Sequence, residues 1–151
     1  MNIKKLSLII KEIERHLELI KYEKSKLSNY SLNEDFENLD LLTFSDAFVF
    51  RFIKLQSAMG EKLFPLLFEI LTGKNHKEVT FIDILNTLEK YGFLDAKYWN
   101  KIRKLRNEFV HIYPWETDLK IEALKEAINE IKNIEKIFYK IRDFCYGKGL
   151  L

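Results

Sequence analysis

The sequence is short of cysteine and of long hydrophobic runs. Cys145 is the only cysteine among 151 residues, which excludes an internal disulfide and fits a reducing compartment. The longest uncharged apolar run covers residues 63–68, far short of the roughly 20 residues that a membrane-spanning helix needs. Charges interrupt the apolar residues at the start of the sequence, unlike the apolar core of a signal peptide. We therefore expect a cytoplasmic protein with no membrane segment.

Signals of β-structure, internal repeats and linkers are also missing. No segment shows sustained alternation of apolar and polar residues, and no Asn-Gly pair marks a hairpin turn. A chain of this length, 47% apolar and 32% charged, has the profile of one globular domain. These features predict a single all-α domain over residues 1–151.

Helical periodicity is present from the first residues onward. Apolar residues at spacings of three and four predict a helix that begins at residue 3 and ends before residue 29. The expected core seam of this helix is Ile3, Leu6, Ile10, Ile13, Leu17 and Ile20. The acidic segment that follows, up to Asp40, predicts a loop.

A second, long helix is expected over residues 43–72, with Thr43 and Asp46 as a capping pair and Gly73 as the stop. Pro65 should kink this helix near its last turns. The segment carries more apolar residues than one helix face can bury in a small monomer. Such a helix is either central in the fold or also packs against another subunit.

Three further helices complete the predicted fold. Thr80 and Asp83 form a second capping pair for a short helix that ends near residue 91, and Asp95 caps a helix that ends near His111. Thr117 or Asp118 should cap the last helix. The expected core face of the last helix is Leu124, Ile128, Ile131, Phe138, Ile141 and Cys145. This pattern predicts an antiparallel four-helix up-and-down bundle with an additional short helix.

Arginine is scarce, since the chain has 20 lysines and five arginines. Two of the five, Arg103 and Arg106, lie in a basic run over residues 97–106 that contains no acidic residue. Arginine offers a planar, permanently charged fork that suits phosphate. Its use where lysine is the default residue favours a specific role, although a charge run is more often a solvated surface.

The basic run leads into the most informative segment of the chain, Arg106-Asn107-x-x-x-His111-x-Tyr113-Pro114. Histidine exchanges protons near neutral pH, and arginine can neutralise charge that develops on a phosphoryl group. With a 2′-hydroxyl supplied by RNA, these groups suffice to cleave a phosphodiester without a metal. The three histidines are scattered and have no acidic cluster near them, so no metal site is predicted.

The helical spacing constrains how these groups meet. Arg103, Asn107 and His111 are each four residues apart and share a face, whereas Arg106 and His111 differ by about 140° around the helix. Two arrangements would bring Arg106 and His111 together. The helix can loosen before Pro114, or the site can form across a two-fold axis from two subunits. The very apolar second helix favours the two-fold arrangement.

The motif resembles the signature of the HEPN superfamily, and more closely that of HepT-like toxins from HEPN–MNT toxin–antitoxin pairs. Residues 50–65 and 80–85 are also similar to such proteins, so the resemblance covers roughly residues 43–115. It implies a homodimer that cleaves RNA, with tRNA among the candidate substrates, and that needs no cofactor. It also implies neutralisation by a minimal nucleotidyltransferase antitoxin.

Within this resemblance, the catalytic set maps onto Arg106, Asn107 and His111, and the tyrosine that accepts AMP maps onto Tyr113. Arg103, Lys104 and Arg51 are candidate RNA-binding residues, the alternative for each being an ordinary surface charge. The competing function is a non-catalytic subunit that presents a nucleotide or substrate to a nucleotidyltransferase. A plain helical dimerisation domain is the third alternative.

Overall fold

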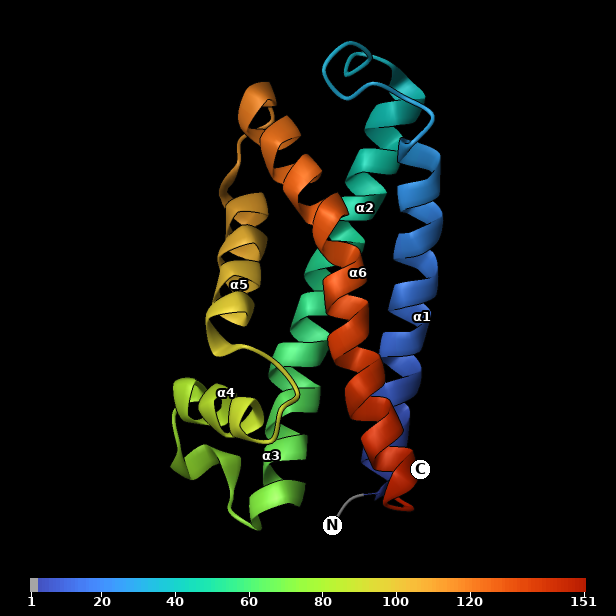
Figure 1. Cartoon of the computed structure of the whole chain (residues 1–151). Helices are drawn as coiled ribbons and strands as arrows, with labels where there is room; N and C mark the ends of the chain where they lie inside the picture. The colour runs from blue at the N-terminus through green and yellow to red at the C-terminus, as the bar shows by residue number, and fades with distance from the viewer. Residues whose placement is uncertain (1–2) are drawn as a thin grey trace.

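The computed structural model describes residues 3–151 and contains helices but no strand over that range (Figure 1). The prediction of an all-α fold is therefore confirmed, while residues 1–2 lie outside the described part of the predicted domain. Within residues 3–151, no helix combines the length and the apolar character that a membrane crossing requires.

The first helix, α1 (Ile3–Leu27), has the predicted extent and seam with one exception. The five later seam residues are buried, whereas Ile3 is 48% exposed. Ile3 is the first residue of α1, which begins at one end of the molecule (Figure 1). The loop predicted before Asp40 spans residues 28–38.

The second helix begins earlier than predicted. It starts as α2 (Leu39–Ser57), whose N-cap is Asn38: the side-chain oxygen of Asn38 accepts hydrogen bonds from the backbone N–H groups of Asp40 and Leu41. Thr43 is not a cap, because its hydroxyl donates to the carbonyl of Leu39 inside the helix. The Thr43–Asp46 prediction was wrong because Asn38, five residues before Thr43, supplies the cap.

A π-helical segment, η1 (Ala58–Leu63), separates α2 from α3 (Phe64–Thr72). Proline lacks an N–H and crowds the carbonyl four residues earlier, so Pro65 disfavours regular α-helical pairing just before it. The helical turn before Pro65 is wider than an α-helical turn: the N–H of Phe64 bonds to the carbonyl of Met59, five residues back. Gly73 ends α3 as predicted, with a left-handed φ of 72°.

A short 3₁₀ turn (His76–Glu78) leads to α4 (Phe81–Lys90), α5 (Ala96–His111) and α6 (Thr117–Gly147). The capping box of Thr80 with Asp83 and the cap at Asp95 are confirmed. The expected cap at Thr117 or Asp118 was wrong. Glu116 occupies the N-cap position of α6, and its carboxylate accepts from the N–H of Tyr113 instead of capping the helix.

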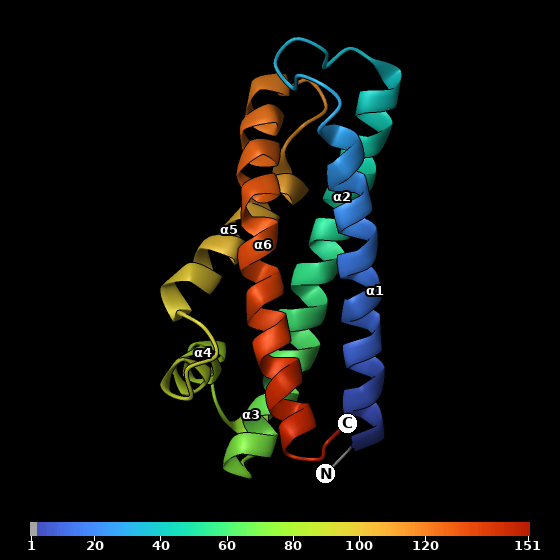
Figure 2. The ribbon, with the colours of Figure 1, turned by 45° about the vertical axis from the view of Figure 1, so that its right-hand side comes forward.

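The long helices lie lengthwise beside one another, and α4 is short and lies across the end of α5 (Figures 1 and 2). The helix formed by α2, η1 and α3 is central, since it contacts α1, α4, α5 and α6. This position accounts for its many apolar residues, with Phe48 and Phe52 fully buried. Phe50, in contrast, remains 54% exposed.

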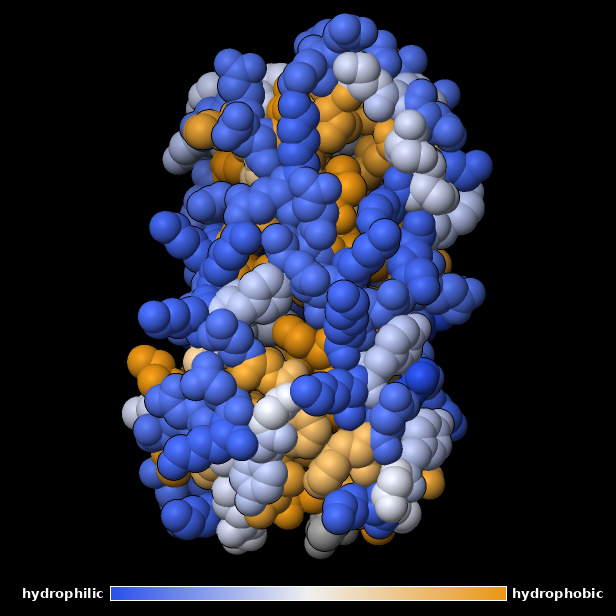
Figure 3. All heavy atoms as spheres, viewed as in Figure 1, coloured by the Kyte–Doolittle hydropathy of each residue, from blue (hydrophilic) through white to orange (hydrophobic). Residues whose placement is uncertain are grey.

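The core face predicted for α6 is buried apart from Ile128, which is half-buried. Figure 3 shows that hydrophilic residues cover most of one face of the molecule, while hydrophobic residues are visible between the helices and toward the end where α3 and α4 lie.

Candidate active site

The motif lies on the second half of α5 and on the turn that follows it. Trp99, Ile102, Leu105 and Phe109 form the buried face of α5. Trp99 packs edge-on against Phe64, with ring centroids 4.6 Å apart. These contacts fix the rotation of α5, so the direction in which each motif side chain leaves the helix is also fixed.

Arg106 and Asn107 lie on the side of α5 that faces η1 and α4. Here a hollow of about 220 Å³, which we call the arginine hollow, lies between α5, α4 and the π-helical segment. Its lining residues are Gln56, Gly60, Glu61, Phe81, Arg103, Arg106 and Asn107. Arg106 Nη1 donates to the side-chain oxygen of Asn107 over 3.1 Å, so Asn107 orients the guanidinium.

The two arginines of this hollow differ from the other three in the chain. Arg15 and Arg142 pair with carboxylates, and Arg51 bonds to a histidine. Arg103 and Arg106 form no ion pair within residues 3–151; Arg103 instead lies over the ring of Phe81, with its Cζ 4.4 Å from the ring centroid. Two adjacent guanidinium groups without a carboxylate partner form a local positive charge suited to an anion.

The Nε–H of Arg106 is buried and has no hydrogen-bond partner in the described chain, as is also the case for the Nε–H groups of Arg51 and Arg142 outside the hollow. A buried donor left without an acceptor costs free energy, so such groups in native proteins call for an explanation. A ligand in the arginine hollow that supplies an acceptor would explain the unpaired Nε–H of Arg106.

His111 lies elsewhere. It is the last residue of α5, is exposed, and lines a separate hollow of about 520 Å³ between α5 and α6. This second hollow, which we call the histidine hollow, also contains four carboxylates, those of Glu108, Glu116, Glu122 and Glu126. One chain therefore does not bring Arg106 and His111 into the same cavity.

The alternative in which α5 loosens before Pro114 does not match the structure. The helix is regular through His111, and the N–H of Ile112 still bonds to the carbonyl of Glu108 at 3.0 Å. Only Ile112 turns to extended backbone.

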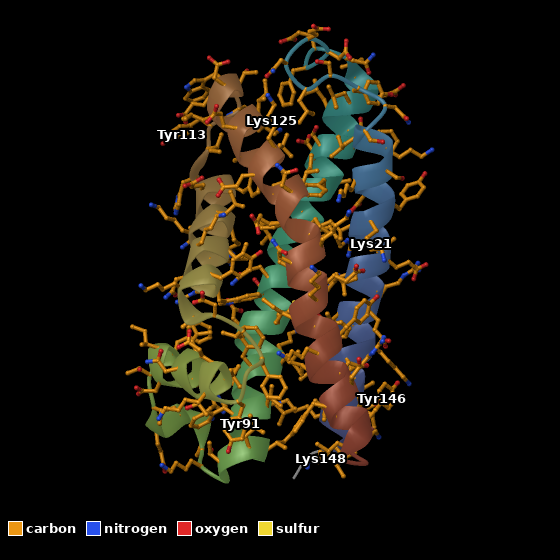
Figure 4. The ribbon with its side chains drawn as sticks, in the orientation of Figure 1. Lys21, Tyr91, Tyr113, Lys125, Tyr146 and Lys148 are labelled. Atoms are coloured by element: carbon orange, nitrogen blue, oxygen red, sulfur yellow. The ribbon has the colours of Figure 1, made fainter. Side chains whose placement is uncertain are left out.

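Tyr113 lies at the end of the molecule opposite Tyr91, beside the connection between α5 and α6 (Figure 4). Its ring is 58% exposed and stacks on Trp115, with centroids 4.8 Å apart and an interplanar angle of 3°. The ring borders a third hollow of about 450 Å³, whose wall includes Phe50 and Phe109. The phenol oxygen makes no hydrogen bond within residues 3–151.

The remaining two candidate RNA-binding residues lie outside the arginine hollow. Lys104 is exposed and forms no ion pair in the described chain. Arg51 is half-buried between α1 and α2, where its Nη1 donates to His16 Nδ1 at 3.0 Å. Because arginine can only donate, His16 Nε2 carries the hydrogen and donates to Glu12. Burial lowers the pKa of His16, which fits this neutral form.

Gln56 is the residue at the site that the sequence analysis missed. It is the single glutamine of the chain and lies near the end of α2, between Leu55 and Ser57. The available signal was an amide on the same helix face as Phe52 and Met59, which are both buried. Within residues 3–151, no group of three or more histidine, cysteine or acidic side chains is placed to hold a metal ion.

No family model, curated protein or solved structure matches the chain.

Proposed function

We propose that this protein is a metal-independent endoribonuclease, the toxin of a HEPN–MNT toxin–antitoxin pair, acting in the cytoplasm. The observation that carries the proposal is the pair of arginines without carboxylate partners, Arg103 and Arg106, in one hollow with Asn107. An RNA phosphate supplies the negative charge and the acceptors that these groups lack. The candidate acid–base group, His111, lies on the same helix.

The active form in this proposal is a homodimer of antiparallel four-helix bundles. Arg106 and His111 occupy different hollows of one chain, so a two-fold axis is needed to place the histidine of one subunit beside the arginine of the other. The carboxylates around His111 repel RNA, and basic residues of the second subunit would offset them. Exposed Phe50, Tyr113 and Trp115 provide apolar surface near the same end of α5.

In the proposed reaction, His111 accepts the proton of the 2′-hydroxyl and the 2′ oxygen attacks the adjacent phosphorus. The bond between phosphorus and the 5′ oxygen breaks, and that oxygen receives the proton that His111 accepted, either directly or by exchange with water, and leaves as a 5′-hydroxyl end. The other product carries a 2′,3′-cyclic phosphate. Arg106, oriented by Asn107, stabilises the charge that builds up on the phosphoryl oxygens.

Cleavage of a mixed RNA pool by the purified dimer tests this proposal. Arg106→Ala and His111→Ala should each reduce the rate by about 10²-fold or more, the usual contribution of such groups. Arg15→Ala, which removes an exposed arginine paired with Glu18, is the matched control and should cleave normally. Wild-type rates in a folded His111→Ala protein would remove the histidine from the mechanism.

The partner in this proposal is a minimal nucleotidyltransferase that transfers AMP from ATP to the Tyr113 oxygen and releases pyrophosphate. The phosphate would add negative charge and bulk near the active site, and the exposed ring of Trp115 offers a surface for the adenine. Intact-mass analysis after co-expression should show an adduct that Tyr113→Phe removes. Tyr146→Phe, which changes another exposed tyrosine, should keep the adduct.

An adduct that persists in Tyr113→Phe would place the modification elsewhere. Absence of RNA cleavage by the unmodified, folded dimer, together with tight binding to the nucleotidyltransferase, would instead identify the protein as a non-catalytic partner subunit.

A further inference from the structure

Gln56 lies at the inner wall of the arginine hollow. The residue as a whole is 5% exposed, and its amide makes no hydrogen bond within residues 3–151. The amide is not among the fully buried polar atoms, so the small part of Gln56 that stays accessible includes polar atoms that face the hollow. A glutamine amide has two donors and an acceptor, which can bond to a ligand in the hollow.

The π-helical segment makes room for this amide. A Cβ atom added at Gly60 would lie 3.3 Å from Gln56 Nε2 and 3.4 Å from Trp99 Nε1. Gly60 therefore lets both side chains approach the backbone of the widened turn closely. The π-helical segment and Gly60 together hold the amide against the hollow that contains Arg103 and Arg106.

We propose that the arginine hollow is a phosphodiester-binding pocket complete within one subunit, in which Gln56 is a binding residue. The two guanidinium groups would hold the non-bridging oxygens, and Gln56 Nε2 would donate to a phosphate or sugar oxygen. Identifying the ligand as RNA rests on the proposed function. The proposal of a pocket requires only that the protein binds single-stranded nucleic acid, and it does not require that RNA is cleaved.

The charge of the pocket matches a diester more closely than a terminal phosphate. Two arginines and the carboxylate of Glu61 leave a net charge of +1, since two positive charges oppose one negative charge. A phosphodiester carries one negative charge, whereas a terminal phosphate carries nearly two at neutral pH. Glu61 therefore disfavours a terminal phosphate and leaves an internal RNA phosphate as the preferred ligand.

The probe that tests the pocket is a fluorescent single-stranded 2′-deoxyhexanucleotide, which has the diesters but lacks the hydroxyl needed for cleavage. Its affinity for the full-length protein is measured by anisotropy over a range of salt concentrations. Gln56→Glu keeps the size of the side chain but puts a carboxylate beside the arginines, so affinity should fall at least about tenfold. Gln56→Met keeps the volume and removes the donors, so affinity should fall about threefold to tenfold with the salt dependence unchanged.

Arg103→Ala should lower the slope of log affinity against log salt by about 0.7, the value for one lost phosphate contact on a single strand. Arg15→Ala, the exposed control, should leave affinity and slope unchanged. Thermal melting by circular dichroism establishes that each variant is folded before binding is measured.

The outcomes separate this pocket from the ribonuclease activity. Wild-type affinity in folded Gln56→Glu and Gln56→Met proteins, or no binding of the probe by the wild type, would overturn the pocket even if RNA is cleaved. Loss of probe binding in these variants supports the pocket even if the wild type cleaves no RNA. That second result would overturn the proposed function alone.

Discussion

Mixed dimers provide the strictest test of a site shared between subunits. Arg106 and His111 leave α5 toward different hollows, so the proposed site combines the arginine of one chain with the histidine of the other. A heterodimer of an Arg106→Ala chain and a His111→Ala chain should therefore contain one intact site and one site that lacks both groups.

The expected rate follows from symmetry. A two-fold dimer has two equivalent sites, so this heterodimer should cleave at about half the wild-type rate, while either homodimer is inactive. A second heterodimer gives the reciprocal control. Wild type paired with the double variant Arg106→Ala/His111→Ala has one defective group in each shared site, and it should be inactive.

Co-expression with two different affinity tags and tandem purification yields each heterodimer free of homodimers. Rates are then compared on the same RNA at equal dimer concentration. If both groups act within one chain, the results reverse: the first heterodimer is inactive and the second retains half the activity. That reversal would refute the shared site, as would a protein that sediments as a monomer at micromolar concentration.

Three further predictions concern the scaffold. Trp99→Ala should lower the free energy of unfolding by about 3–5 kcal/mol in urea denaturation, since the fully buried indole packs on Phe64. Thr80→Ala removes half of a capping box and should cost about 1 kcal/mol, measured in the same way; an unchanged midpoint would contradict the cap. Burial lowers the pKa of His16 below its usual 6.5, so the unfolded chain binds protons first as the pH falls from 7 toward 5, and stability should decline. His16→Gln should flatten that decline while His76→Gln leaves it in place, and equal slopes in both would remove His16 as its source.

Much of the fold could be predicted because local signals and tertiary packing agree. The seam of α1, the capping box at Thr80, the stop at Gly73 and the end of α5 before Pro114 all depend on residues close in sequence. The start of α2 could not be placed from Thr43, because several residues there can cap a helix and only the backbone path shows that Asn38 does.

One feature of the candidate site geometry could be predicted from the sequence. Helical spacing separated Arg106 from His111, and the two side chains line different hollows. The roles of Arg106, Asn107 and His111 remain predictions from the motif. Gln56 could not be predicted as part of the site because it lies 50 residues before Arg106 in the sequence, and only tertiary packing brings it next to α5. The widened turn next to it depends on how the helix accommodates Pro65, and a period of 3.6 residues cannot reveal a π-helical segment.

The proposed function rests on metal-independent RNA cleavage that depends on His111. The most direct measurement is to incubate the purified protein with RNA in EDTA and to identify the chemical ends of the products, with His111→Ala alongside. We expect 2′,3′-cyclic phosphate and 5′-hydroxyl ends from the wild type, and intact RNA with the variant. Intact RNA with the wild type, or the same ends from a folded His111→Ala protein, would contradict the proposed function.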